Sequence, residues 1–144
     1  MMSKDSPPDF KKEIDVVGCF VQYGDTFLLL HRNTKKTNGN KWGCPAGKVD
    51  SGETISQAME RELSEETGLR IDESDFKYFD SYFVRNEGHD LVYHMFSTAV
   101  PVLPEVTINP PEHQGFAWVT PAEALKMDYI HDLDECIRVF YGTP

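Results

Sequence analysis

Three glutamates, Glu62, Glu65 and Glu66, form the part of the sequence best suited to chemistry. Hydrophobic periodicity predicts a helix over residues 54–67. On a helical wheel the three carboxylates continue the apolar sector of this helix, whereas an ordinary acidic run would form a solvated face on the opposite side. The predicted apolar sector consists of Ile55, Ala58, Met59 and Leu63.

Like-charge repulsion makes this arrangement costly unless a cation is present. Glu62 and Glu66 stand at i and i+4 of the helix, so their charges repel by roughly 0.2–0.5 kcal/mol. The helix dipole also disfavours anions near the C-terminal end, where Glu65 and Glu66 lie. Arg61 can pair with Glu65, but it cannot neutralise all three carboxylates. Because carboxylate oxygens are ligands that Mg²⁺ prefers, the spacing predicts a divalent-metal site.

The surrounding residues resemble the Nudix box, the signature of a hydrolase superfamily. Gly47 is followed after five residues by Glu53, and seven further residues lead to the run RELSEETGL at residues 61–69. Every fixed position of the family pattern is present. The approach at residues 42–48 (WGCPAGK) and the later segment 112–119 (EHQGFAWV) also look like those of MutT-like members. The resemblance therefore extends over nearly the whole chain.

This resemblance implies a Mg²⁺-dependent hydrolase, with Mn²⁺ able to substitute, that cleaves a diphosphate linked to another moiety, usually a nucleoside. Carried over residue by residue, Glu62 and Glu66 would be the principal metal ligands. Glu65 would be a further ligand or a support for the attacking water, and the carbonyl of Gly47 would be a backbone ligand. Ala46 replaces a glycine that is common in relatives, a mild departure from the pattern.

Further residues receive roles from the same resemblance. Glu53 and Arg61 would brace the loop against the helix. Glu112 corresponds to a glutamate that contacts the metal or acts as the base in part of the family; the alternative is an exposed loop residue. The candidate substrate-binding residues are Arg32, Lys48 and Trp42. The two basic members could neutralise phosphate or form ordinary solvated surface, and the tryptophan could stack on a base.

Signatures of particular Nudix subfamilies are mostly absent. Residues 80–90 lack the proline typical of ADP-ribose hydrolases, and residues 84–88 lack the tyrosine typical of dinucleoside-polyphosphate hydrolases. What remains favours a nucleoside triphosphate, oxidised forms included, cleaved to the monophosphate and pyrophosphate. Nucleotide sugars and ADP-ribose stay open as alternatives. So does a non-catalytic nucleotide-sensing module, although such modules usually lose the box glutamates.

Composition limits the partners of this chain of 144 residues. Its 14 basic and 24 acidic residues give a net charge of −10, which argues against binding a nucleic-acid polymer but not against a small anion accompanied by a cation. The three cysteines form no CxxC pair, so we expect reduced thiols and a cytoplasmic location. The longest apolar run spans residues 27–30, so we expect no membrane partner. We also predict a homodimer, for which the sequence indicates no interface.

The expected elements suit an α+β fold, specifically a Nudix-type α/β/α sandwich around a mixed β-sheet. Residues 1–12 are predicted to be a flexible arm, and residues 13–144 a single domain. A turn is expected at residues 86–88, and residues 42–53 are expected to form a shaped loop without regular structure. Strands are predicted at 14–22, 26–32, 76–85, 91–100 and 116–119, and helices at 54–67, from 120 onward and at 133–141.

Overall fold

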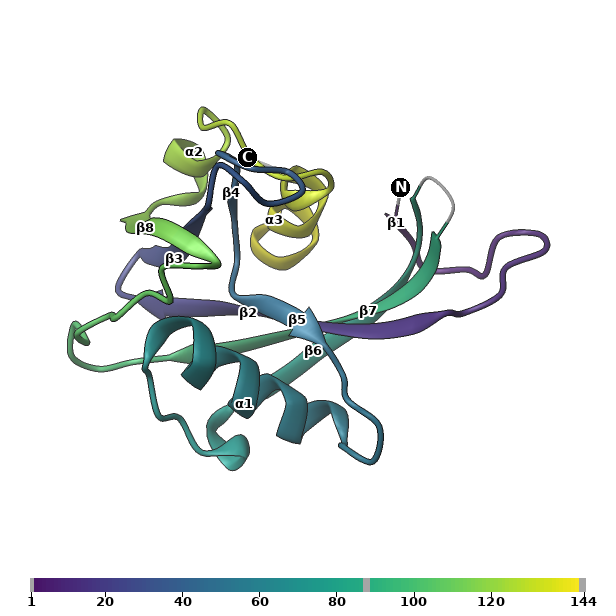
Figure 1. Cartoon of the computed structure of the whole chain (residues 1–144), viewed down its shortest axis with the longest axis horizontal. Helices are drawn as coiled ribbons and strands as arrows, with labels where there is room; N and C mark the ends of the chain where they lie inside the picture. Colours follow the sequence, from purple (N-terminus) through teal and green to yellow (C-terminus); the bar gives the residue numbers. More distant parts are fainter. Residues whose placement is uncertain (1, 87–88, 143–144) are drawn as a thin grey trace.

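A mixed sheet forms the middle layer of the structure (Figure 1), a computed structural model that describes residues 2–86 and 89–142. The sheet order is β1-β6-β7-β2-β3-β4, with β5 also paired to β2 and β8 to β3. Only the β2–β7 pair is parallel among the described strand pairs. The strands are β1 (Met2–Ser3), β2 (Ile14–Tyr23), β3 (Thr26–Arg32), β4 (Trp42–Gly43), β5 (Ala46–Lys48), β6 (Lys77–Asn86), β7 (His89–Ala99) and β8 (His113–Val119).

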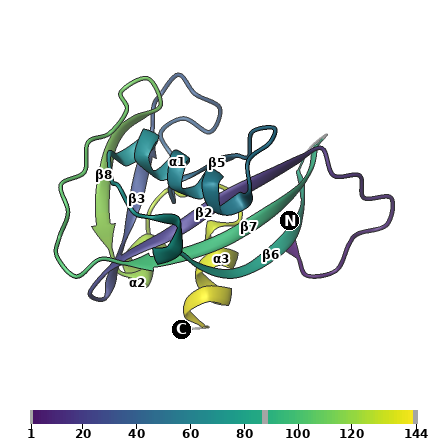
Figure 2. The same cartoon turned by 90° about the horizontal axis from the view of Figure 1, so that it is seen from below.

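Helices cover both faces of this sheet. In Figures 1 and 2, α1 (Ile55–Thr67) lies on one side of the sheet, whereas α2 (Pro121–Ala124) and α3 (Leu133–Tyr141) lie on the other. A short 3₁₀ turn at Glu73–Asp75 follows α1. The arrangement confirms the predicted α/β/α sandwich around a mixed sheet. No helix in the described part of the chain is long and apolar enough to cross a membrane.

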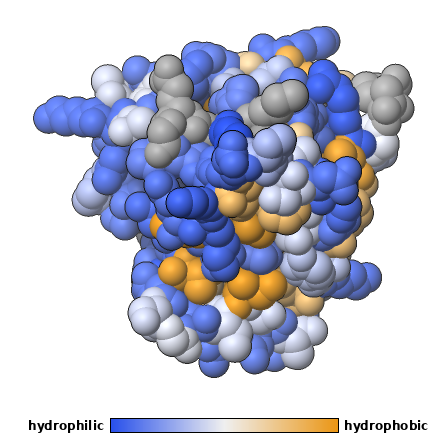
Figure 3. Space-filling model, turned by 90° about the vertical axis from the view of Figure 1, so that its right-hand side faces the viewer, coloured by the Kyte–Doolittle hydropathy of each residue, from blue (hydrophilic) through white to orange (hydrophobic). Residues whose placement is uncertain are grey.

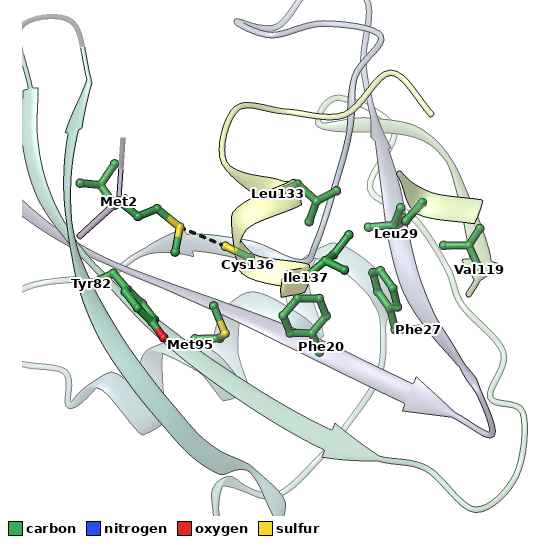
Figure 4. Packing of buried hydrophobic residues seen from close by; sticks show 12 residues of the cluster. Met2, Phe20, Phe27, Leu29, Tyr82, Met95, Val119, Leu133, Cys136 and Ile137 are labelled. Atoms are coloured by element: carbon green, nitrogen blue, oxygen red, sulfur yellow. Dashed lines mark hydrogen bonds between the residues drawn. The ribbon is translucent and has the colours of Figure 1, made fainter. Parts of the chain in front are cut away.

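The hydrophobic core has two halves, one on each face of the sheet. Strand β2 serves both, because alternate side chains of a strand point to opposite faces. Val17, Cys19 and Val21 pack beneath α1, in what we call the α1-side core. Phe20 points the other way and packs with Ile137 of α3, in the α3-side core (Figure 4). The sheet thus separates two environments that can be shaped independently.

The helix starts expected near residues 54 and 120 are confirmed, each by a capping box. The Thr54 side chain accepts a hydrogen bond from the Gln57 backbone, and the Gln57 side chain bonds back to the Thr54 N–H, which completes a capping box. Thr120 and Glu123 form the same box at the start of α2. Helix α1 ends at Gly68, whose φ of 73° lies in the left-handed region that glycine tolerates best. These local signals fix the ends of α1 and therefore the direction of its glutamates.

The segment before α1 differs from the expected irregular loop. It contains two short strands, β4 and β5, which pair with β3 and β2 respectively. Gly47 of β5 stands opposite Val17 of β2. Strands this short obtain their hydrogen bonds from distant neighbours, so no local pattern of residues could indicate them. Through β5, the segment that precedes α1 is hydrogen-bonded to the central sheet.

The N-terminal residues also differ from the expected free arm. Met2 and Ser3 form β1, which pairs with Val84 and Phe83 of β6. The Met2 side chain is only 9% exposed and belongs to the α3-side core. Strands β6 and β7, which correspond to the strands expected at residues 76–85 and 91–100, pair antiparallel. The turn expected at residues 86–88 lies partly outside the described residues.

Candidate active site

Four glutamates meet in a pocket of about 540 Å³, which we call the acidic pocket. Three of them, Glu62, Glu65 and Glu66, come from the last two turns of α1. The fourth, Glu112, comes from the loop that leads into β8. Gly47 of β5 lines the pocket as well. The structure therefore brings together every residue that the resemblance assigned to metal binding or catalysis.

Glu66 is the most deeply placed of these acids. Its side chain is almost fully covered, with the residue 8% exposed, and its Oε1 accepts a hydrogen bond of 2.9 Å from the Ala46 N–H. Burial raises its pKa to about 8, and the nearby charge of Glu62 contributes to the same shift. A carboxylate held in this way is short of positive charge, which is the electrostatic condition that a cation would relieve.

Glu62 lies directly against the backbone of Gly47. A Cβ atom added at Gly47 would overlap the carboxylate carbon and both carboxylate oxygens of Glu62. Any side chain at this position would therefore displace the Glu62 carboxylate, so glycine is what lets this carboxylate lie against the strand. Burial also raises the pKa of Glu62, while Arg61 acts in the opposite sense. The Glu62 carboxylate therefore lies between α1 and β5, against Gly47 and within hydrogen-bond distance of Arg61.

Arg61 ties the loop and the helix together. Its Nε donates to Glu53 Oε2 at 2.7 Å, and its Nη2 donates to Glu53 Oε1 at 3.0 Å. The same Nη2 donates to the Lys48 carbonyl at 3.0 Å. Its Nη1 turns toward the acids, 2.9 Å from Glu62 and 3.3 Å from Glu65. Bonds in a fixed guanidinium fork set the distance between β5 and α1, as expected of a brace.

The donor set fits a hard divalent cation. Within residues 2–86 and 89–142, no three His, Cys, Asp or Glu side chains are grouped closely enough to hold a metal by themselves. The ties to Arg61 account for part of this, because they draw Glu62 and Glu65 toward the guanidinium. The acidic side chains of the pocket all offer oxygen atoms. Mg²⁺ commonly keeps water and substrate phosphate as ligands beside one or two carboxylates. Glu62 and Glu66 would supply those carboxylates.

Glu112 lines the same pocket from the loop before β8 rather than from α1. Its side chain is 41% exposed, and its Oε1 lies 3.6 Å from Lys36 Nζ. Its charge helps to raise the pKa of Glu66, after the larger effects of burial and of Glu62. The loop is held in place because the Asn33 N–H donates to the Glu112 carbonyl at 3.0 Å. Glu112 is thus neither a remote loop residue nor a buried ligand.

Only two of the three candidate substrate-binding residues reach the acidic pocket. Arg32 and Lys48 line it, and the Nε of Arg32 is held by the Thr37 carbonyl at 2.9 Å. Trp42 does not line it: its ring stacks on His31 at 4.3 Å, nearly parallel, beside the α3-side core. Four further polar lining residues were not among the candidates from the sequence: Lys36, Thr37, Asp50 and Asn109. The lysine-rich loop at residues 34–37 was the available signal.

A second pocket, the apolar pocket, lies on the α3 side of the sheet. It has a volume of about 180 Å³ and is lined by Val16, Leu91, Tyr93 and Leu133, with the carboxyl-bearing Asp132 at its border. Figure 3 shows apolar surface gathered among hydrophilic residues on the face that forms the right-hand side of Figure 1. Ala46 lines both pockets, so the two meet at one residue of β5.

Comparisons with known proteins agree with this geometry. The family pattern described as NUDIX domain matches residues 12–140. The chain is 31% identical to the CTP pyrophosphohydrolase of Escherichia coli over 115 residues, which are 80% of this chain and 82% of that protein. It also resembles the crystal structure of a MutT protein from Methanosarcina mazei, with a TM-score of 0.79, 24% identity, and coverage of 91% and 94% of the two chains.

Other matches are local. The human 8-oxo-dGDP phosphatase NUDT18 is 37% identical over 57 residues, which are 40% of this chain and 17% of that protein. In another curated relative the matched part spans only 14% of the relative's length. These matches concern a shared segment rather than a whole protein.

Proposed function

The chain belongs to the NUDIX domain family and is a Nudix hydrolase, and from this premise we propose that it is a Mg²⁺-dependent pyrophosphohydrolase of nucleoside triphosphates. The products are the nucleoside monophosphate and pyrophosphate, and oxidised triphosphates are included among the substrates. Mn²⁺ can take the place of Mg²⁺. The observation that carries this proposal is Glu66, a buried carboxylate kept beside the like charge of Glu62 in a pocket that opens toward basic residues.

The two pockets divide the substrate between them. Triphosphate lies in the acidic pocket, where Arg32, Lys36 and Lys48 offer positive charge. The base lies in the apolar pocket, and its sugar passes Ala46, the residue that both pockets share. The carboxylate of Asp132 lines the apolar pocket with its Oδ1 3.4 Å from His131 Nε2, and because a carboxylate accepts several hydrogen bonds it would also accept an N–H from the edge of the base. One nucleotide thus spans the edge of the sheet at β5.

The residues of the acidic pocket perform distinct tasks in cleavage. Glu62 and Glu66 would hold the cation, which would neutralise phosphate charge and lower the pKa of the attacking water. Glu65 or Glu112 accepts the proton of the attacking water, whose oxygen forms the new bond to phosphorus as the bridging P–O bond breaks. Arg61 fixes the helix against β5, so the acids keep their positions while pyrophosphate departs.

A nucleotide panel tests the proposal directly. The panel contains canonical and oxidised nucleoside triphosphates, a nucleoside diphosphate sugar and ADP-ribose, each incubated with 5 mM EDTA or with about 5 mM Mg²⁺, a concentration above typical metal dissociation constants. We expect Mg²⁺-dependent release of pyrophosphate and monophosphate from a triphosphate. If ADP-ribose or a nucleotide sugar were cleaved faster than every triphosphate, that compound would replace nucleoside triphosphates as the proposed substrate class. Binding without turnover across the panel would indicate a sensing module instead.

A further inference from the structure

The N-terminal residues contribute a side chain to the apolar pocket. Met2 lines this pocket together with Val84 of β6 and Cys136 of α3. Figure 4 shows Met2 reaching from the strand β1 toward α3, where its Sδ lies 3.5 Å from Cys136 Sγ. Met2 is buried although it stands at the beginning of the described chain. A residue in this position forms part of the wall of the pocket.

Contacts outside the pocket hold this segment in place. We call residues 2–13 the N-terminal strap; it runs along the β6–β7 hairpin. Beyond the β1–β6 pairing, further contacts hold it to residues of β6 and β7 that are not among those that line the pocket. They include the Lys4–Asp80 ion pair at 2.6 Å, the edge-on Phe10–Phe83 contact at 5.0 Å, the bond from Arg85 to the Pro8 carbonyl at 3.0 Å and the bond from the Lys11 N–H to Asp90 at 2.9 Å.

We propose that the strap is a specificity element of this enzyme, in which Met2 closes one wall of the apolar pocket and limits the size of the base that can enter. The proposal rests on the proposed function, because it takes the apolar pocket as the place of the base. Of residues 2–13, only Met2 lines the apolar pocket, and the surface contacts of the later residues help to fix its position.

Methionine suits a wall that sets size rather than shape. Its unbranched, flexible side chain fills irregular space and packs well against a flat ring. The pocket is about 180 Å³ with Met2 in place, so the loss of this side chain enlarges it appreciably. Base discrimination in an apolar pocket is sensitive to such changes, since a single methylene group alters selectivity by about tenfold or more.

The test compares two methionine variants. Met2→Ala removes the wall, whereas Met95→Ala removes a methionine from the same α3-side core that does not line the pocket. For each variant, kcat/KM is measured with dGTP and with dCTP. We expect Met2→Ala to raise the purine-to-pyrimidine ratio by roughly fivefold or more, mainly through KM, and Met95→Ala to leave the ratio unchanged while lowering the melting temperature. An unchanged ratio in folded Met2→Ala overturns the proposal.

A second measurement keeps the proposal separate from the proposed function. The methyl signal of Met2 is followed by NMR in wild-type protein labelled at methionine methyl groups, during titration with the α,β-methylene analogue of dGTP in Mg²⁺. We expect this signal to shift; a signal unmoved at saturation overturns the proposal. If the wild-type chain cleaves no nucleotide in the panel, the proposed function fails, and this titration still decides the strap. Should Met2→Ala not fold, Met2→Leu must show a smaller rise of the same ratio.

Discussion

The acidic pocket and the apolar pocket meet at Ala46, yet the two are built in opposite ways. The acidic pocket places carboxylates where burial and mutual repulsion make them costly, as the raised pKa of Glu66 shows. The apolar pocket is a gap left in ordinary hydrophobic packing, and its lining residues stabilise the fold. Removing a side-chain group should therefore have opposite effects on stability in the two pockets. Loss of a carboxylate charge from the acidic pocket should raise the free energy of unfolding, and loss of a side chain from the apolar pocket should lower it.

The two pockets also differ in how the chain supplies them. In the acidic pocket, the three glutamates of α1 and the Glu53–Arg61 pair that braces them come from residues 53–66, one continuous stretch with fixed spacing, although Arg32 and Glu112 come from elsewhere. The apolar pocket draws on β1, β2, β6, β7 and the start of α3, which are spread over most of the chain. The chemistry can therefore be recognised from a short segment, whereas the choice of base depends on residues that only the fold brings together.

Glu66→Gln should lower Mg²⁺-dependent turnover more than any other variant considered. Normal turnover in this variant would remove the proposed difference between the two pockets. The variant keeps the side-chain shape and an oxygen for the Ala46 N–H, but removes the charge. We expect Mg²⁺-dependent turnover to fall by a factor on the order of 10² or more, because one of the principal oxygen ligands is weakened. Glu60→Gln, on the same helix but outside the acidic pocket, is the control. Near-normal turnover in Glu66→Gln would contradict the assignment.

The pH dependence of stability in EDTA should show the cost of Glu66. A carboxyl whose folded pKa is about 8 binds its proton more tightly in the folded than in the unfolded chain. The destabilisation is therefore absent below the ordinary pKa of glutamate and grows as the pH rises toward 8. Urea unfolding at pH 4.5 and pH 9 should find Glu66→Gln equal to wild type at the lower pH and more stable by a few kcal/mol at the higher, from about 1.4 kcal/mol per pKa unit. A constant difference would argue against a buried carboxylate.

Arg61→Lys should have an intermediate effect. Lysine keeps the charge but cannot reach Glu53, the Lys48 carbonyl and Glu62 at once. We expect a fall in kcat of about 10- to 100-fold, as for supporting residues around a metal site, and a loss of roughly 1–3 kcal/mol in unfolding free energy. Steady-state kinetics and urea unfolding on one preparation measure both. An effect on KM alone would show that Arg61 binds substrate rather than bracing the helix.

Trp42→Phe should have the smallest effect and sharpens the comparison from outside both pockets. The ring stacks on His31, and phenylalanine keeps a flat ring there. We expect kcat/KM for a triphosphate to change by less than about twofold, because this ring lines neither pocket. A larger change confined to KM would restore the interpretation that this tryptophan stacks on the base.

Local rules account for much of what the sequence predicted. The capping box at Thr54 and the left-handed Gly68 depend only on neighbours in the chain, so the ends of α1 were predictable. The strand β5 and the docking of Met2 depend on partners far along the chain, and no local pattern encodes such pairings. For the same reason the sequence could name Arg32 for the acidic pocket but also named Trp42, which the fold turns elsewhere.

Ala46 connects the two pockets through a single residue. Its N–H donates to Glu66 on one side, and the same residue lines the apolar pocket on the other. With the nucleotide placed as proposed, the sugar would contact this residue, so binding of the base would bear on the position of the buried carboxylate without touching it. A fragment without a base, such as inorganic triphosphate, would therefore lose turnover as well as affinity, because binding energy from the remote part of a substrate can be used to align the reacting part.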